Sequence, residues 1–165
     1  MRHSRAFAPA ALAAFLWLLA PAVASADATV FIGANTAPAN RVAKGVAIGA
    51  GLLIIGFEFE YADTTDDVAA GAPSLKTGTG NVLLQTPIAF AGVQPYFEIG
   101  GGVYHEELGT FSNTGFTGNT GGGVKISLVG PVRLRVDYRL ITLKNGALTS
   151  STPAHRIYAG LNLKF

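Results

Sequence analysis

The stretch that decides the fold is Val132-Arg133-Leu134-Arg135-Val136-Asp137-Tyr138-Arg139-Leu140, in which apolar and charged residues alternate. Successive side chains of a β-strand point to opposite faces, so one face of this segment is apolar and the other is charged. We therefore expect a strand that separates an apolar environment from a polar one.

The same alternation occurs in two further segments. One places apolar residues opposite glutamates: Leu53, Ile55, Phe57, Phe59 and Tyr61 against Gly56, Glu58, Glu60 and Ala62. The other ends the chain: Ile157, Ala159, Leu161, Leu163 and Phe165 against Arg156, Tyr158, Gly160, Asn162 and Lys164. Each apolar face covers about five positions in ten residues, the length of a tilted strand that crosses a bilayer.

The first 26 residues predict a cleavable export signal. Arg2 and Arg5 precede an apolar run of about 15 residues, which is shorter than a membrane-spanning helix. Ala24 and Ala26 give the small-x-small pattern of signal peptidase sites, so we expect cleavage after Ala26 and a mature domain of residues 27–165.

Composition excludes several classes of protein. Of the 12 basic residues, Arg2 and Arg5 leave with the signal, so residues 27–165 carry 10 basic and 10 acidic residues. A formally neutral chain of this kind does not indicate nucleic-acid binding. The absence of cysteine excludes a disulfide framework and cysteine–zinc sites.

Eight strands are predicted, an even number that suits a bacterial barrel. The expected spans are 28–36, 41–49, 53–62, 80–88, 94–104, 117–128, 132–142 and 155–165. The odd connections, 35–40, 63–79, 105–116 and 144–154, are longer than the even ones, 50–52, 89–93 and 129–131. A soluble sandwich is the alternative, but the export signal and this asymmetry favour an all-β, antiparallel up-and-down transmembrane barrel.

Several motifs resemble the OmpA-like and opacity-type family of eight-stranded outer-membrane barrels. They are the glycine-rich segment 44–49 leading into 56–61, the Pro-Tyr…Gly-Gly-Gly strand 95–102, segments 121–125 and 136–139, and the ending 160–165. The resemblance implies an integral outer-membrane protein surrounded by lipid and lipopolysaccharide. It also implies delivery by a secretion channel, periplasmic chaperones and the barrel-assembly machinery, with Tyr158, Gly160 and Phe165 as the assembly signal; Leu163 stands where an aromatic is common.

If the apolar faces meet lipid, the lumen holds the charges. The predicted network consists of Glu58, Glu60, Glu98 and Asp137 with Lys125, Arg133, Arg135, Arg139, Arg156 and Lys164. Side chains fill an eight-stranded barrel, and buried ions are costly unless paired. Both a salt-bridged structural plug and a narrow gated channel remain open. Six glycines are expected to make room for bulky inward residues: Gly45, Gly49, Gly100, Gly102, Gly121 and Gly123.

We predict no catalytic, cofactor-binding or metal-binding residues. A His-x-Ser arrangement, which one type of barrel enzyme requires, is absent at His105 and His155. The acidic residues of the expected loops suit divalent cations or a surface partner, which makes adhesion a third function: Asp63, Asp66, Asp67, Glu106 and Glu107. The sequence leaves the oligomeric state and any ligand open.

Overall fold

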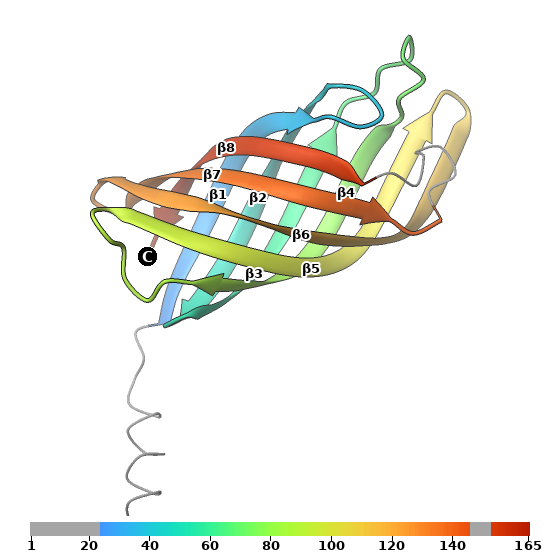
Figure 1. The fold of residues 1–165 in the computed structure, drawn as a ribbon. Helices are drawn as coiled ribbons and strands as arrows, with labels where there is room; N and C mark the ends of the chain where they lie inside the picture. Colours follow the sequence, from blue (N-terminus) through green and yellow to red (C-terminus); the bar gives the residue numbers. More distant parts are fainter. Residues whose placement is uncertain (1–23, 146–152) are drawn as a thin grey trace, which may run out of the picture.

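The computed structural model describes residues 24–145 and 153–165, which form a closed barrel of eight antiparallel strands (Figure 1). Each strand pairs with the next along the chain, and β1 also pairs with β8. The strands are β1 (Ala24–Asn35), β2 (Arg41–Leu52), β3 (Ile55–Thr64), β4 (Ser74–Gln85), β5 (Val93–Leu108), β6 (Phe111–Val129), β7 (Val132–Leu143) and β8 (Ala154–Lys164). The predicted fold class is confirmed. In the described part of the chain no helix is long and apolar enough to cross a membrane.

The strands close with a stagger of ten residues. Paired positions followed once around the barrel lead from Ser25 through β2–β8 and back to β1 at Asn35. Closing a sheet with such a stagger requires strands tilted by about 35–45° to the barrel axis. The start of β1, the end of β8 and the β2–β3, β4–β5 and β6–β7 turns lie at one end, called here the terminal end; the opposite end is the loop end (Figure 1).

The barrel is apolar outside and charged inside. On β3, Phe57 is 63% exposed, whereas its neighbour Glu58 is 5% exposed. Exposed and buried positions alternate along this strand, as the sequence predicts for β3. A water-soluble sandwich has the opposite distribution, so the sandwich alternative is wrong.

Glycines make room for the aromatic side chains of the lumen. Phe31 is paired with Gly45 on β2 and with Gly160 on β8, and a Cβ at either glycine would meet Phe31. The Phe31 ring stacks on Tyr158 with centroids 4.1 Å apart. At Gly123, a Cβ would lie 2.6 Å from the Tyr96 hydroxyl. These small positions let large side chains fit into a narrow interior.

Several strand limits differ from the prediction. β4 starts at Ser74 rather than at residue 80, because Thr77 and Thr79 face inward and leave no apolar alternation to detect. The predicted loop 105–116 is wrong: β5 and β6 continue through it as a hairpin closed by Gly109 and Thr110. The second predicted turn, 89–93, is also too short, since the connection runs over 86–92. The β5–β6 connection, expected to be long, is therefore short, and the β4–β5 connection, expected to be short, is longer than predicted.

The start of β1 overlaps the predicted signal. Ala24, Ser25 and Ala26 pair with Leu52, Gly51 and Ala50, so the expected cleavage point lies inside the strand. Cleavage after Ala26 remains a prediction. Residues 1–23 of the signal, and 146–152 of the fourth predicted loop, lie outside the described residues.

A row of polar residues crosses the outer surface near the loop end. Neighbouring strands β2–β6 place these outward residues side by side: Lys44, Asp63, Lys76, His105 and Thr114. On the terminal side of this row, the exposed residues of β3 are Ile55, Phe57, Phe59 and Tyr61. The register is regular except for one shift between Ser127 and Val129, where Leu128 forms a bulge in β6.

Candidate functional site

The centre of the lumen is occupied by Arg135 from β7. Its guanidinium contacts Glu58 of β3 through two nitrogens, and its Nη2 lies 3.2 Å from Asp137 Oδ2 and 3.5 Å from Glu98 Oε2. Arg135 is fully buried. The planar guanidinium binds carboxylate oxygens in pairs, so one arginine joins acids from β3, β5 and β7.

Arg139, four residues further along β7, extends the same network. It contacts Glu98, and its Nη1 and Nε lie 2.9 Å from Glu60 Oε2 and 3.0 Å from Asp137 Oδ1. Arg156 on β8 is its neighbour in the sheet and donates to Glu60 Oε1 over 3.2 Å. Glu60 thus separates two adjacent like charges that would otherwise repel each other.

Two tyrosines complete this central network. Tyr96 donates its hydroxyl hydrogen to Asp137 and accepts a hydrogen bond from Arg135 Nε at 2.7 Å. The Tyr158 hydroxyl accepts from Arg139 Nη2 at 3.0 Å and lies 3.4 Å from Glu60 Oε2. Neither tyrosine was predicted in the network, although Tyr158 was placed on the polar face of the last strand. Tyr96 lies two residues before Glu98 and therefore faces the same side of the strand, which would have indicated its place in the network.

No room remains for water in part of the central network. The space bounded by Glu60, Arg139 and Arg156 is too small to hold a water molecule. The three arginines face four carboxylates, so the charges nearly cancel. Such an arrangement links strands on different sides of the barrel through ion pairs.

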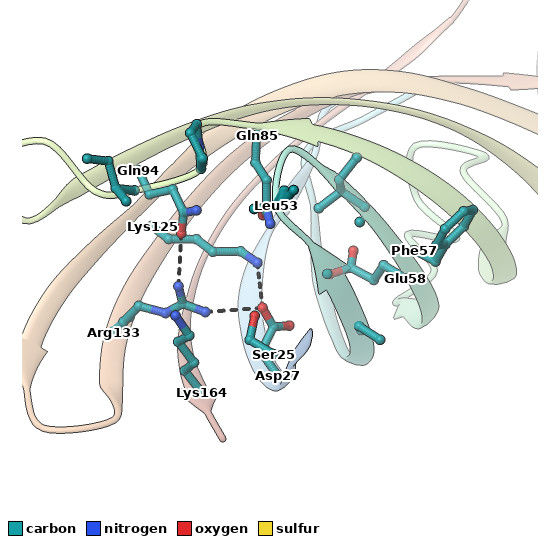
Figure 2. A pocket seen from close by; sticks show the side chains of 17 residues that line it. Ser25, Asp27, Leu53, Phe57, Glu58, Gln85, Gln94, Lys125, Arg133 and Lys164 are labelled. Carbon is teal, nitrogen blue, oxygen red and sulfur yellow. Dashed lines mark hydrogen bonds and ion pairs between the residues drawn. The ribbon is translucent and has the colours of Figure 1, made fainter. Parts of the chain in front are cut away.

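The terminal end of the lumen is different, because it opens into a vestibule (Figure 2). Lys125 Nζ and Arg133 Nη2 both contact Asp27 Oδ2, at 2.6 and 3.1 Å. Arg133 also donates to Gln94 Oε1 at 3.0 Å and to Asn162 Oδ1 at 2.8 Å. Beside these groups lies a cavity of about 300 Å³.

The vestibule separates three predicted residues from the rest of the network. Lys125 and Arg133 pair with Asp27, which was not among the predicted lumen residues because the first strand was expected to begin after it. Lys164 lines the cavity, and among the described residues no carboxylate lies within ion-pair distance of it. The predicted set is therefore divided into a central group and a vestibule group.

The loop end of the lumen holds polar residues that sequence reasoning missed. Glu106 was predicted in an acidic loop; this is wrong, since it is fully buried on β5 and accepts a hydrogen bond from Asn113 Nδ2 at 2.9 Å. Arg41 is also buried, and its Nη2 donates to the Ala37 carbonyl at 2.8 Å. Glu107 does face outward, 3.1 Å from His105 Nε2.

The predicted assembly residues occupy distinct positions. Tyr158 points into the lumen, Gly160 accommodates Phe31, and the Phe165 side chain is exposed. The Phe165 backbone exchanges two hydrogen bonds of 2.9 Å with Ala26. Their role as a signal remains a prediction.

The histidines in the described part of the chain make polar contacts on the outer surface of the barrel. His105 contacts Thr114 and Glu107, and His155 Nδ1 lies 2.5 Å from the Tyr138 hydroxyl on the outer wall. Among residues 24–145 and 153–165, no cluster of three or more histidine, cysteine or acidic residues could hold a metal ion.

The sequence matches no protein-family model and no curated protein. Solved structures match the fold. Neisserial surface protein A (NspA) is 16% identical with a TM-score of 0.64, over 86% of this chain and 96% of that one. The N-terminal β-barrel domain of Pseudomonas aeruginosa OprF is 15% identical with a TM-score of 0.62, over 86% and 97%.

An enzyme also shares this architecture. The outer-membrane enzyme PagL is 15% identical with a TM-score of 0.50, over 84% of this chain and 98% of that one. The fold therefore does not decide whether the chain is catalytic. What the likeness establishes is the architecture that the family resemblance predicted: this chain has the fold of the small eight-stranded outer-membrane β-barrels.

Proposed function

We propose that this protein is a structural outer-membrane barrel whose lumen is closed by its central charge network. The outward face of the barrel is apolar and its solved structural neighbours are outer-membrane proteins, which supports a position within that membrane. The terminal end faces the periplasm in this proposal, as expected for a barrel with both chain ends on one side.

The observation that carries the proposal is the set of contacts around Arg135 and Arg139. Together they join Glu58, Glu60, Glu98 and Asp137 across the lumen, and all six side chains are buried. Removing one partner from a buried ion pair costs about 3–5 kcal/mol, so opening the centre by separating these groups is costly. The network thus favours a closed barrel over a permanently open pore.

Conductance across a planar bilayer tests this proposal. Residues 27–165 would be refolded in detergent, checked for the heat-dependent gel shift of folded barrels, and inserted. We expect no conductance steps from the parent protein. The double variant Arg135→Ala/Arg139→Ala removes the central cations and serves as the positive control, because it should conduct once inserted. Reproducible steps from the parent would overturn the closed-lumen proposal.

A narrow channel is the second candidate, and the vestibule favours it. The cavity of about 300 Å³ already gives solvent access to Lys125 and Arg133 from the terminal end. The central network and the buried loop-end residues, among them Arg41 and Glu106, then separate the two sides, so a path would open if both groups exchanged partners. Parent conductance that disappears on neutralising Glu58 would support this candidate.

Surface adhesion is supported by a different feature. The β5 and β6 strands contain 16 and 19 residues, and their hairpin extends past the ends of β7 and β8 at the loop end (Figure 1). Phe111 at its tip is exposed. Shortening this hairpin should abolish adhesion without affecting the barrel if the surface is the functional part.

A further inference from the structure

The turns at the terminal end carry large apolar side chains that are mostly exposed. Phe90 is 85% exposed, Val129 80% and Ile88 77%. These residues belong to an apolar rim, defined here as Leu53, Ile54, Ile88, Phe90, Leu128 and Val129, to which all three turns contribute. Contiguous exposed apolar surface of this kind marks an interaction site.

The apolar rim contains no charge. Residues 50–55, 85–93 and 126–132 include no lysine, arginine, aspartate or glutamate. The charged groups of this end, Asp27, Lys125, Arg133 and Lys164, instead line the vestibule. At the loop end, by contrast, the β3–β4 connection carries Asp66 and Asp67. Turns that project into water normally carry polar residues, so the rim is unusual for such a position.

The height of the barrel places the apolar rim at the membrane boundary. Asp63 belongs to the outward polar row and Ile55 lies eight residues below it on β3. At about 3.3 Å per residue and a tilt of about 40°, this distance is about 20 Å along the barrel axis. Lys76 and Leu84 on β4 have the same separation. The apolar band of a transmembrane barrel is about 25 Å tall, so it extends past Ile55 and Leu84 into the turns.

We propose that the apolar rim is embedded in phospholipid on the periplasmic side of the membrane, instead of projecting into the periplasm. The inference rests on the proposed outer-membrane location. The structure favours phospholipid as the partner. The rim continues the apolar outer wall, with no charged residues between the two. It also lacks the charges that would select a soluble partner. A second protein on this surface is an outcome that the experiment distinguishes.

Single-tryptophan depth measurements test the proposal. The only tryptophan of the chain is Trp17, so residues 27–165 contain none. The variants Phe90→Trp and Val129→Trp report two different turns. Ile99→Trp reports the outer wall of β5, and Phe111→Trp reports the tip of the β5–β6 hairpin. All four positions are exposed, so the larger side chain should not disturb folding, and the heat-dependent gel shift checks this.

The variants would be reconstituted in nanodiscs, which leave both faces open to solution. Fluorescence is measured with brominated phospholipid and, separately, with iodide in the buffer. We expect Phe90→Trp and Val129→Trp to show blue-shifted emission, strong loss of fluorescence with brominated lipid and little loss with iodide. Phe111→Trp should show the reverse pattern.

The outcomes separate this inference from the proposed function. If Ile99→Trp is quenched by lipid but both rim variants are quenched by iodide, the rim lies in water and only the inference fails. If brominated lipid does not quench Ile99→Trp, the membrane location itself is wrong. Rim variants that respond to neither quencher lie in a protein contact, which also overturns the lipid assignment.

Discussion

The centre of the lumen and the vestibule use the same chemistry in different surroundings. β7 contributes to both, with Arg135 and Arg139 in the centre and Arg133 in the vestibule. The Arg135 side chain is fully buried against several carboxylates, whereas Arg133 and Asp27 are 10% and 14% exposed beside a cavity. Two residues along one strand therefore separate a fully buried arginine from one that lies beside the cavity, and Glu58, which pairs with Arg135, lies at the boundary because it also lines the cavity.

This difference shows that a charged side chain facing the lumen is not enough to close it; the burial of the side chain and its ion-pair partners also matter. A charge left unpaired among fully buried groups loses its partner without regaining hydration, while one in the vestibule can be hydrated. We therefore expect equivalent substitutions to have unequal effects in the two regions.

The largest expected effect is that of Arg135→Ala. It leaves Glu58, Glu98 and Asp137 without one of their shared cations and should lower the free energy of unfolding by about 3–5 kcal/mol. Urea unfolding of the refolded barrel in lipid vesicles measures the change. Arg133→Ala is the matched control in the vestibule and should cost clearly less. Equal resistance of Arg135→Ala and the parent to heat and urea would contradict a stabilising network.

A second prediction concerns the packing around the central tyrosine. Gly123→Ala places a methyl group against the Val136 carbonyl oxygen and the Tyr96 hydroxyl and should cost about 1–3 kcal/mol through overpacking. Gly80→Ala is the control, because a Cβ there meets nothing within 4 Å. Unfolding midpoints of the two variants provide the comparison. Similar values would show that the lumen around Tyr96 adjusts freely.

Asp27→Asn probes the vestibule directly. The substitution removes the only carboxylate that contacts Lys125 and Arg133, among the described residues, but water can reach both cations. We expect a loss of about 1–2 kcal/mol in unfolding free energy, diminishing in high salt. A loss as large as that of Arg135→Ala would remove the distinction between the two regions.

The smallest effect on stability is expected from deleting Phe165. Its side chain is exposed, and the backbone bonds it makes are to Ala26, which the predicted cleavage removes. Refolded protein should therefore unfold within about 0.5 kcal/mol of the parent. Outer-membrane levels in cells should nevertheless fall if this residue is part of the assembly signal. Unchanged levels would exclude it from that role.

Alternation predicted the inward face well wherever both faces were chemically distinct. On β3 and β7, charged residues alternate with large apolar ones, and Glu58, Glu60, Arg135 and Arg139 all face the lumen. On β4 and at the β5–β6 hairpin, threonine, glycine and asparagine give the two faces similar polarity, so alternation does not distinguish them there. Glu106 was misplaced for this reason.

Partner choice within the lumen could not be predicted from the sequence. Glu58 and Arg135 are 77 residues apart and meet only because of the way the barrel closes. The stagger sets the relative heights of strands that face each other across the lumen, and alternation within one strand carries no information about it. Asp27 was missed as the partner of Lys125 because the first strand was expected to start one residue later.

The bulge at Leu128 shows where such a barrel tolerates a change in length. Each strand is bonded to two neighbours around a closed ring, so one residue inserted within a strand would move every later inward side chain of that strand to the outer wall. In β7 that exchange would bring arginines against lipid. The extra residue of β6 lies beyond Ser127, next to the turn, where hardly any of the strand remains to be inverted. Insertions and deletions in relatives of this barrel should therefore concentrate in connections and strand ends, while strand interiors keep their length.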